Sequence, residues 1–357
     1  MKAAVLKAFG EPLSVRQVPD PALGTGEVVV DVVAAGVLPY MAEVLSGERQ
    51  YLLTLPATPG AGAVGRVRSV GPDTTRLTVG DWVLCDPTVR SRDGAPTPDI
   101  TLQGLSARGD GGLRLQQHFG RGSFAEQLLV PTENVFPLGS IDPAEAPRWA
   151  ALNVCLVPYG GLLAADLKAG ETVLVNGATG YFGSAGVAVA LAMGAGRVVA
   201  AGRNRDRLAQ LAHRFGSRLR TVSLTGDEDE DRDRMRRAHD PIDVVLDLLP
   251  PAAGTAPVRA AAMTVRESGR VVLMGGVGML GGDDLALPYP WFMRNSITVR
   301  GQWMYPPHAN TRLIELARSG LLDLDQFEVT EFDLDNAGQA VAHATARAPF
   351  SLTVIRP

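Results

Sequence analysis

The sequence predicts an α/β protein that combines a doubly wound parallel sheet with a second domain of short β-strands. Two observations predict this organisation. Before about residue 156, short strand-like runs are punctuated by Gly, Pro and Asp, which is typical of a compact β domain. Beyond that point, apolar runs alternate with helical patterns, which is typical of a parallel sheet covered on both faces. A chain of 357 residues is long enough for two such domains.

The first part of the chain contains four strand-like runs, at residues 27–37, 63–71, 80–86 and 122–131. Strands of this length and spacing favour a barrel-like domain. The segment between Cys85 and Gly122 is rich in Gly, Arg, Asp and Pro, so we expect a surface excursion there. Residues 306–357 contain one more helical pattern and further short strands.

The middle of the chain alternates strands with helices. Strand-like runs occur at residues 171–176, 197–204, 242–250, 269–278 and 296–305. Helical patterns occur at 184–196 and 205–216, and the second is amphipathic and ends on a glycine. The charged run GDEDEDRDRMRRAHD (226–240) is expected to be a solvated helix or loop.

Composition disfavours several classes of function. The net charge is −4 and no long basic tract exists, so we expect no nucleic-acid partner. The N-terminal residues lack the apolar region of a signal peptide, and no run of about 18 apolar residues predicts a membrane span. Cys85 and Cys155 do not form a disulfide framework, so the expected location is the reducing cytoplasm.

Two glycine clusters compete as nucleotide-binding loops. PGAGAVGRV (59–67) contains a G-x-G-x-x-G, but prolines precede it and a strand-like run follows, so we interpret the match as accidental. GATGYFG (177–183) has looser spacing, yet it lies between a strand and a helix. Glycines there let the backbone approach a pyrophosphate, whose charge the start of the helix stabilises.

The next strand ends at Gly202, where the adenosine ribose of a dinucleotide is expected. The residues that follow are Arg203, Asn204 and Arg205, with Arg207 one turn further. No carboxylate is present to repel a 2′-phosphate, and a guanidinium can bind it. The sequence therefore favours NADP(H). The alternative is that these arginines only solubilise the start of the helix.

Taken together, the motifs resemble the medium-chain dehydrogenase/reductase superfamily. The segments that carry the resemblance are MKAAVLKAFGEPL, AAGV, PGAGAVGRVRSVG, VGDWVLCDP, GSFAEQLLVPTENVFPLG, LKAGETVLVNGATGYFG and SGRVVLMGG. The resemblance implies a GroES-like β-barrel domain at 1–155 and 306–357, and a Rossmann-type dinucleotide-binding domain at 156–305. It is closest to the zinc-independent branch of quinone oxidoreductase-like and enoyl reductase-like proteins.

The metal positions of the family decide this branch. Zinc-dependent members carry a Cys at the position of Leu38 and His-Glu at the positions of Ala61 and Gly62, none of which can ligate zinc here. Residues 86–122 lack the closely spaced cysteines of the structural-zinc lobe, and the five histidines show no ligand spacing. We therefore expect no zinc. Without this Lewis acid, reduction of an electrophilic substrate is favoured over alcohol oxidation.

The resemblance implies a substrate cleft between the domains, lined by the loop after AAGV. Tyr40 is the nearest hydroxyl in that loop, and we predict that it donates a proton or orients the substrate. Tyr51 and Glu43 are weaker candidates. The zinc-free branch often has Asn where Leu38 stands and an acid near Met41, so the match is imperfect. The alternative is that Tyr40 forms an aromatic wall of an apolar pocket.

Other residues correspond to cofactor contacts of the family, with ordinary packing as the alternative for each. Those of the glycine loop and helix start are Gly177, Ala178, Thr179, Gly180, Tyr181, Phe182 and Gly183. Those after the next strand are Gly202, Arg203, Asn204 and Arg207. Those expected around the nicotinamide half are Asn153, Pro158, Asp247, Leu248, Met274, Gly275, Gly276, Gln302 and Met304.

The sequence thus predicts a zinc-independent, NADPH-dependent oxidoreductase that transfers hydride to an activated double bond beside a carbonyl, or to a quinone. The alternatives are a carbonyl reductase or alcohol dehydrogenase of the same fold, and a catalytically weak NADPH-binding sensor. The expected partners are a small-molecule substrate and a second copy of the chain. The run SITVRGQW (296–303) is expected at a sheet edge, where family members form homodimers by sheet extension.

Overall fold

In a computed structural model that describes residues 1–346 and 348–357, the chain divides into two compact units. The first comprises Met1–Asn153, Leu324–Arg347 and Ser351–Pro357, and the second Val154–Asp323 and Ala348–Phe350. Residues 306–323, which the sequence assigned to the first domain, group with the second unit.

The first unit is built around a seven-stranded sheet in the order β10-β5-β4-β3-β18-β17, with β9 paired to β3. Its strands are β3 (Glu27–Gly36), β4 (Ala63–Val70), β5 (Trp82–Cys85), β9 (Gln127–Pro131), β10 (Val135–Pro137), β17 (Glu328–Asp333) and β18 (Ser351–Arg356). β1 (Lys2–Val5) and β2 (Ser14–Gln17) form a separate antiparallel pair. Most apolar residues of β3, β5 and β18 are buried and form the core of this unit.

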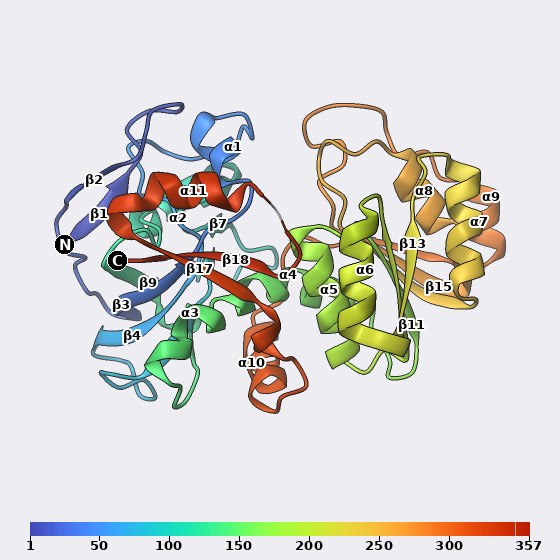
Figure 1. The fold of residues 1–357 in the computed structure, drawn as a ribbon. Coiled ribbons are helices and arrows are strands. Elements are labelled where there is room, and N and C mark those ends of the chain that lie inside the picture. Colours follow the sequence, from blue (N-terminus) through green and yellow to red (C-terminus); the bar gives the residue numbers. More distant parts are fainter. Residues whose placement is uncertain (347) are drawn as a thin grey trace. The chain divides into compact units, whose positions relative to one another are not determined.

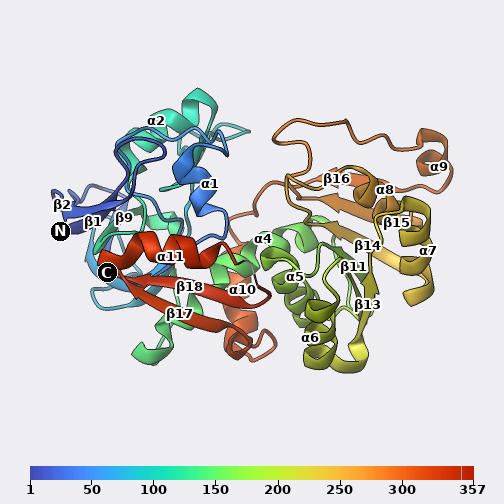
Figure 2. The same cartoon turned by 45° about the horizontal axis from the view of Figure 1, so that its top comes forward.

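Short helices flank this sheet. They are α1 (Met41–Ser46), α3 (Ala146–Trp149), α11 (Ala337–Ala344), η1 (Thr132–Asn134), η2 (Pro143–Glu145), η4 (Leu324–Gln326) and η5 (Leu334–Asn336). Figures 1 and 2 both show α11 running alongside β17 and β18. It packs there through Ala337, Ala340, Val341 and Ala344, which follow helical spacing on one buried face.

The segment expected as a surface excursion is instead folded. It forms a three-stranded sheet, β6 (Thr88–Arg90), β7 (Ile100–Leu102) and β8 (Ser106–Arg108), followed by α2 (Gly109–Phe119). The expectation was wrong because the strands have only three residues each, too few to show an alternating pattern. Two glycines also look like loop residues, yet Gly111 and Gly112 let α2 approach Asp99 and the Ile100 carbonyl closely.

The second unit contains a six-stranded, fully parallel sheet in the order β13-β12-β11-β14-β15-β16. The strands are β11 (Thr172–Asn176), β12 (Arg197–Gly202), β13 (Leu219–Ser223), β14 (Ile242–Asp247), β15 (Val265–Leu273) and β16 (Thr298–Gly301). The strand order reverses between β11 and β14, which is where doubly wound sheets bind ligands. The predicted α/β fold with a doubly wound parallel sheet is therefore confirmed.

Helices cover both faces of this sheet. The helices of this unit are α4 (Ala151–Ala164), α5 (Tyr181–Ala192), α6 (Arg205–Phe215), η3 (Gly216–Arg218), α7 (Glu228–Ala238), α8 (Ala256–Ala262), α9 (Tyr289–Arg294) and α10 (Ala309–Arg318). Figures 1 and 2 show α5 and α6 on one face, and α7 and α8 on the other. The charged run forms α7, which Asp227 caps and which buries only Asp231 and Met235. Within the described residues, no helix is long and apolar enough to cross a membrane.

The third glycine of the first cluster is required by packing rather than by a ligand. Gly65 lies on β4, where a Cβ would stand 2.3 Å from the Asp31 carbonyl oxygen and 2.6 Å from Val30 Cγ1. We predict that Gly65→Ala lowers the free energy of unfolding by about 1–3 kcal/mol, measured by urea denaturation. Gly338→Ala in the same unit is the control, because its Cβ would meet open space at the start of α11. An unchanged urea midpoint for Gly65→Ala would contradict the packing.

Candidate functional site

The predicted nucleotide loop lies between β11 and α5, in the context that this role requires. Gly177 has a φ of 87°, a conformation that favours glycine. A Cβ on Gly183 would stand 2.0 Å from the Gly177 carbonyl oxygen, so the helix starts directly against the loop. Gly180 caps α5 without a side chain, so nothing from the cap competes for the first N–H groups. These N–H groups can bind an anion.

The first glycine cluster has a different context. Gly60 and Gly62 have φ values of 109° and 78° in the loop that enters the antiparallel strand β4, and no helix follows them there. A Cβ on Gly60 would stand 2.6 Å from Ser123 Oγ and 2.7 Å from the Phe124 backbone nitrogen. These glycines therefore serve close packing, and the G-x-G-x-x-G spacing is accidental, as the sequence indicated.

The end of β12 meets the nucleotide loop directly. A Cβ on Gly202 would lie 2.6 Å from Thr179 Cγ2, so only a glycine fits there. Arg207 Nη1 donates to the Thr179 carbonyl at 3.3 Å, which brings a guanidinium to the same loop. Asn204 caps α6 by accepting from the Arg207 N–H at 3.0 Å. Arg203 is exposed, and its guanidinium has no partner in the described part of the chain.

A buried carboxyl lies where β11 and β14 end. Asp247 is 2% exposed and accepts from Asn176 Nδ2 at 2.8 Å and from the Leu249 N–H. Burial raises the pKa of Asp247 to about 7, although these two hydrogen bonds act in the opposite direction. A Cβ on Gly275 would stand 2.6 Å from Asp247 Oδ2. Asp247 therefore connects the ends of β11, β14 and β15.

The remaining predicted residues of the second unit pack around these strand ends. Leu248 and Pro158 both face Gly186 of α5. Met274 Sδ would lie 2.3 Å from a Cβ on Gly161, and Pro251 covers Gly276. Gln302 Nε2 donates to the Met304 carbonyl at 3.3 Å, and Met304 has a φ of 57°.

The start of α5 contributes Tyr181 and Phe182, whose rings meet edge to face. Ala178 is buried in the loop.

Tyr40 lies in the first unit and precedes α1. The Arg49 guanidinium carbon lies 4.2 Å from the centre of the Tyr40 ring, a cation–π distance. Arg49 Nε donates to Glu43 Oε2 at 2.8 Å, and its side chain is 8% exposed. Tyr51 meets Tyr40 edge to face at 6.5 Å. Arg49 therefore connects all three residues considered from the sequence, although no motif indicated it.

The half-buried Tyr40 hydroxyl keeps its proton at neutral pH. Burial raises the pKa of Tyr40, and the nearby Tyr51 acts in the same direction. The Arg49 guanidinium acts in the opposite direction but is the weaker influence. Tyr40 can thus serve as a hydrogen-bond or proton donor.

The positions that hold zinc in related enzymes do not fit a metal in this chain. Ala61 is buried, and Leu38 offers only an apolar side chain. A Cβ on Gly62 would stand 2.7 Å from Asn153 Nδ2, so the Asn153 amide fills the space of a side chain there. In the described ranges, no group of three or more His, Cys, Asp or Glu side chains could hold a metal ion.

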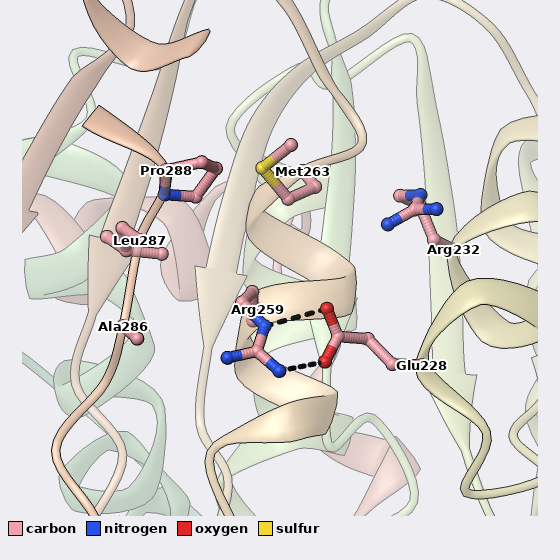
Figure 3. A pocket seen from close by; sticks show the side chains of 7 residues that line it. All are labelled: Glu228, Arg232, Arg259, Met263, Ala286, Leu287 and Pro288. Atoms are coloured by element: carbon pink, nitrogen blue, oxygen red, sulfur yellow. Dashed lines mark hydrogen bonds and ion pairs between the residues drawn. The ribbon is translucent and has the colours of Figure 1, made fainter. Parts of the chain in front are cut away.

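Figure 3 shows a separate pocket of about 400 Å³ on the second unit. Its lining residues come from α7, α8 and the segment before α9, and they are Glu228, Arg232, Arg259, Met263, Ala286, Leu287 and Pro288. Two hydrogen bonds join the Arg259 guanidinium to the Glu228 carboxylate at its centre. None of these residues is among the predicted site residues. The ion pair within the pocket joins α7 to α8.

The raised pKa of Asp247 predicts a pH-dependent stability. Folding binds a proton between pH ~4 and ~7, so the stability that this carboxyl contributes is present at low pH and is lost as the pH rises through about 7. Asp247→Asn should therefore gain stability relative to wild type between pH 5 and 8, by about 2–3 kcal/mol, as measured by urea unfolding. The exposed Asp283→Asn should follow wild type. A constant difference between Asp247→Asn and wild type across this range would refute the prediction.

Comparison with known proteins places the chain in a family. Residues 24–140 match the family model of the alcohol dehydrogenase GroES-like domain, and residues 182–319 match that of zinc-binding dehydrogenases. An acryloyl-coenzyme A reductase from Metallosphaera sedula is 29% identical over 292 residues, covering 81% of each chain. An alcohol dehydrogenase from Rhizobium meliloti is 31% identical over 308 residues, covering 84% of this chain and 83% of the relative.

A crystal structure of a zinc-binding dehydrogenase from Sinorhizobium meliloti, bound to NADP, has the same fold. Its TM-score is 0.82 at 23% identity, and the superposition covers 100% of this chain and 99% of that one. At this identity the likeness shows the fold alone. The sequence relatives and the two family models together show that the chain belongs to the medium-chain dehydrogenase/reductase superfamily of oxidoreductases.

Proposed function

We propose that this protein is a zinc-independent, NADPH-dependent oxidoreductase that reduces an α,β-unsaturated carbonyl compound or a quinone. The observation that carries the proposal is the contact between Gly62 and Asn153. The amide fills the space where a metal-binding side chain would stand, and Leu38 and Ala61 offer no ligand. Without a Lewis acid, an acceptor that is already electrophilic is the favoured substrate. The similarity to an acryloyl-coenzyme A reductase supports this class of acceptor.

We propose that the second unit binds NADP(H), which supplies the hydride when bound. The N–H groups at the start of α5 would hold the pyrophosphate, with Gly177 and Gly183 allowing its close approach. Arg203, whose guanidinium is exposed, would bind the 2′-phosphate. Arg207, whose guanidinium donates to the Thr179 carbonyl, would assist Arg203 in binding the 2′-phosphate.

Tyr40 would act on the substrate side, in the first unit. Its ring is held against Arg49, and its hydroxyl stays protonated at neutral pH because burial raises its pKa. It would therefore orient the acceptor oxygen or return a proton to the reduced product. Arg49 and Glu43 would position the ring through their hydrogen bond.

An alcohol dehydrogenase or carbonyl reductase is the second candidate. It is favoured by the match to the zinc-binding dehydrogenase model and by several relatives that are named alcohol dehydrogenases. Such an enzyme would need another way to stabilise the alkoxide, since the metal positions do not fit zinc.

We also propose a homodimer formed through β16. This strand is at the edge of the parallel sheet, and all four of its residues are exposed. Large apolar side chains nearby are exposed as well, namely Met293, Val299 and Trp303. An unpaired edge with an apolar surface is a site for strand pairing.

Arg203→Ala should weaken NADPH binding by about 10- to 100-fold and leave NADH binding nearly unchanged. The variant removes a charge-assisted contact of roughly 1.5–3 kcal/mol that only the 2′-phosphate can make. Titration of the nicotinamide fluorescence measures both dissociation constants. Arg220→Ala, which removes an exposed positive charge from β13, is the matched control. Equal effects of Arg203→Ala on the two cofactors would exclude its contact with the 2′-phosphate.

A panel of acceptors tests the reaction itself. We expect NADPH oxidation with enones, acryloyl thioesters or quinones, and little reduction of NADP⁺ by primary and secondary alcohols. The absorbance of NADPH measures both directions on the same protein. Efficient alcohol oxidation would favour the second candidate. Tight NADPH binding without turnover of any acceptor would instead indicate a sensor protein.

A further inference from the structure

Asn153 is an unusual residue of the first unit, because both polar atoms of its side chain are buried without a partner. Its backbone N–H donates to the Ala150 carbonyl at 3.2 Å in the first turn of α4. The side-chain Nδ2 and Oδ1, by contrast, form no hydrogen bond with any described residue. A buried polar group left unpaired costs about 1–3 kcal/mol. Groups of this kind call for an explanation, such as a ligand that completes them.

The amide lies where related enzymes hold a metal. A Cβ on Gly62 would stand 2.7 Å from Nδ2 and 2.9 Å from Oδ1, so the amide lies directly over the Gly62 backbone. The φ of Gly62 is 78°, which keeps this position open for the amide. A neutral donor therefore replaces a cation at the place where the family polarises the substrate oxygen. The torsion of an asparagine amide is broad, so it can turn toward a ligand oxygen at little cost.

Ser123, in the segment between α2 and β9, provides a contrast to Asn153. Its Oγ also lacks a partner among the residues described, and it lies beside Gly60. However, Ser123 is 0% exposed and is covered by the neighbouring backbone. The Asn153 side chain is only partly buried as a whole. Of the two residues, only Asn153 keeps exposed surface, and a turn of its amide would bring the buried Nδ2 to a substrate.

The chemistry of the proposed reaction needs such a donor. Hydride leaves C4 of the reduced nicotinamide as the cofactor is oxidised, and a new C–H bond forms at the electrophilic carbon of the acceptor. The electrons of the conjugated double bond then move to the carbonyl oxygen, which becomes an enolate that a proton later neutralises. A fixed N–H donor at that oxygen lowers the barrier, because the negative charge grows there.

We propose that Asn153 Nδ2 is a catalytic hydrogen-bond donor to the substrate oxygen, in place of the Lewis acid of the zinc enzymes. This inference rests on the proposed function and adds a residue to it. It also changes the role of Asn153, which the sequence predicted as a contact of the cofactor. The donor stabilises the transition state, so it affects kcat more than NADPH binding.

Three variants test this role, with acceptor reduction, the dissociation constant of NADPH and Tm measured for each. Asn153→Ala should lower kcat by about 10²- to 10³-fold, as expected for the loss of an oxyanion donor. It should leave NADPH binding unchanged and should not lower Tm, because the buried amide forms no hydrogen bond that the variant would lose. Ser123→Ala, which removes another unpartnered buried polar group of the first unit, should keep wild-type kcat.

Asn153→Asp sharpens the test because it keeps the shape and replaces the donor with a carboxylate. We expect a greater loss of kcat than for Asn153→Ala, and a loss that deepens as the pH rises and the carboxyl ionises. Residues with only a structural role do not produce such a pH profile. An active wild type with unchanged kcat in Asn153→Ala, or a weakened NADPH affinity as its main effect, overturns this inference alone. A wild type that reduces no acceptor overturns the proposed function as well.

Discussion

The absence of a side chain at position 62 determines the chemistry available to the first unit. With φ at 78° and the Asn153 amide 2.7 Å from the place of a Cβ, this position accepts only glycine. A metal-binding side chain would displace the amide, so the proposed site would rely on neutral donors. A neutral donor stabilises charge on a carbonyl oxygen less than a metal ion does, and an activated acceptor compensates for the difference.

The second unit depends on the same kind of constraint. Gly183, Gly202 and Gly275 each let another group approach to between 2.0 and 2.6 Å of where a Cβ would be. The nucleotide loop, the end of β12 and the Asp247 carboxyl are held together as a result. Asp247 is important because it accepts hydrogen bonds from Asn176 at the end of β11 and from Leu249 just after β14. The arrangement leaves the start of α5 facing the carboxyl edge of the sheet, where an anion binds best.

Much of the fold could be predicted from the sequence, because β11, β12 and β14 are mostly apolar, β15 ends in an apolar run, and the glycines between β11 and α5 have a recognisable spacing. The three-residue strands β6, β7 and β8 could not be predicted, since they are too short for a pattern. β13 buries only two of its five residues, Leu219 and Val222, so its signal is weak as well.

Within the site, the sequence indicated which residues lie close together only where they belong to a family motif. Arg49 follows Tyr40 by nine positions with no motif between them, and its role depends on the turn after α1. The unpaired amide of Asn153 is likewise a property of packing. Its residue type was visible in the sequence, but its contact with Gly62, 91 positions earlier, was not.

We propose that the site works without a metal, and the metal content of active protein tests this proposal. Protein produced in zinc-supplemented medium would be analysed by inductively coupled plasma mass spectrometry, and the same sample assayed for NADPH-dependent reduction of an enone. We expect full activity with far less than one zinc per chain. One zinc per chain, with activity that falls on its removal and returns on its addition, would contradict it.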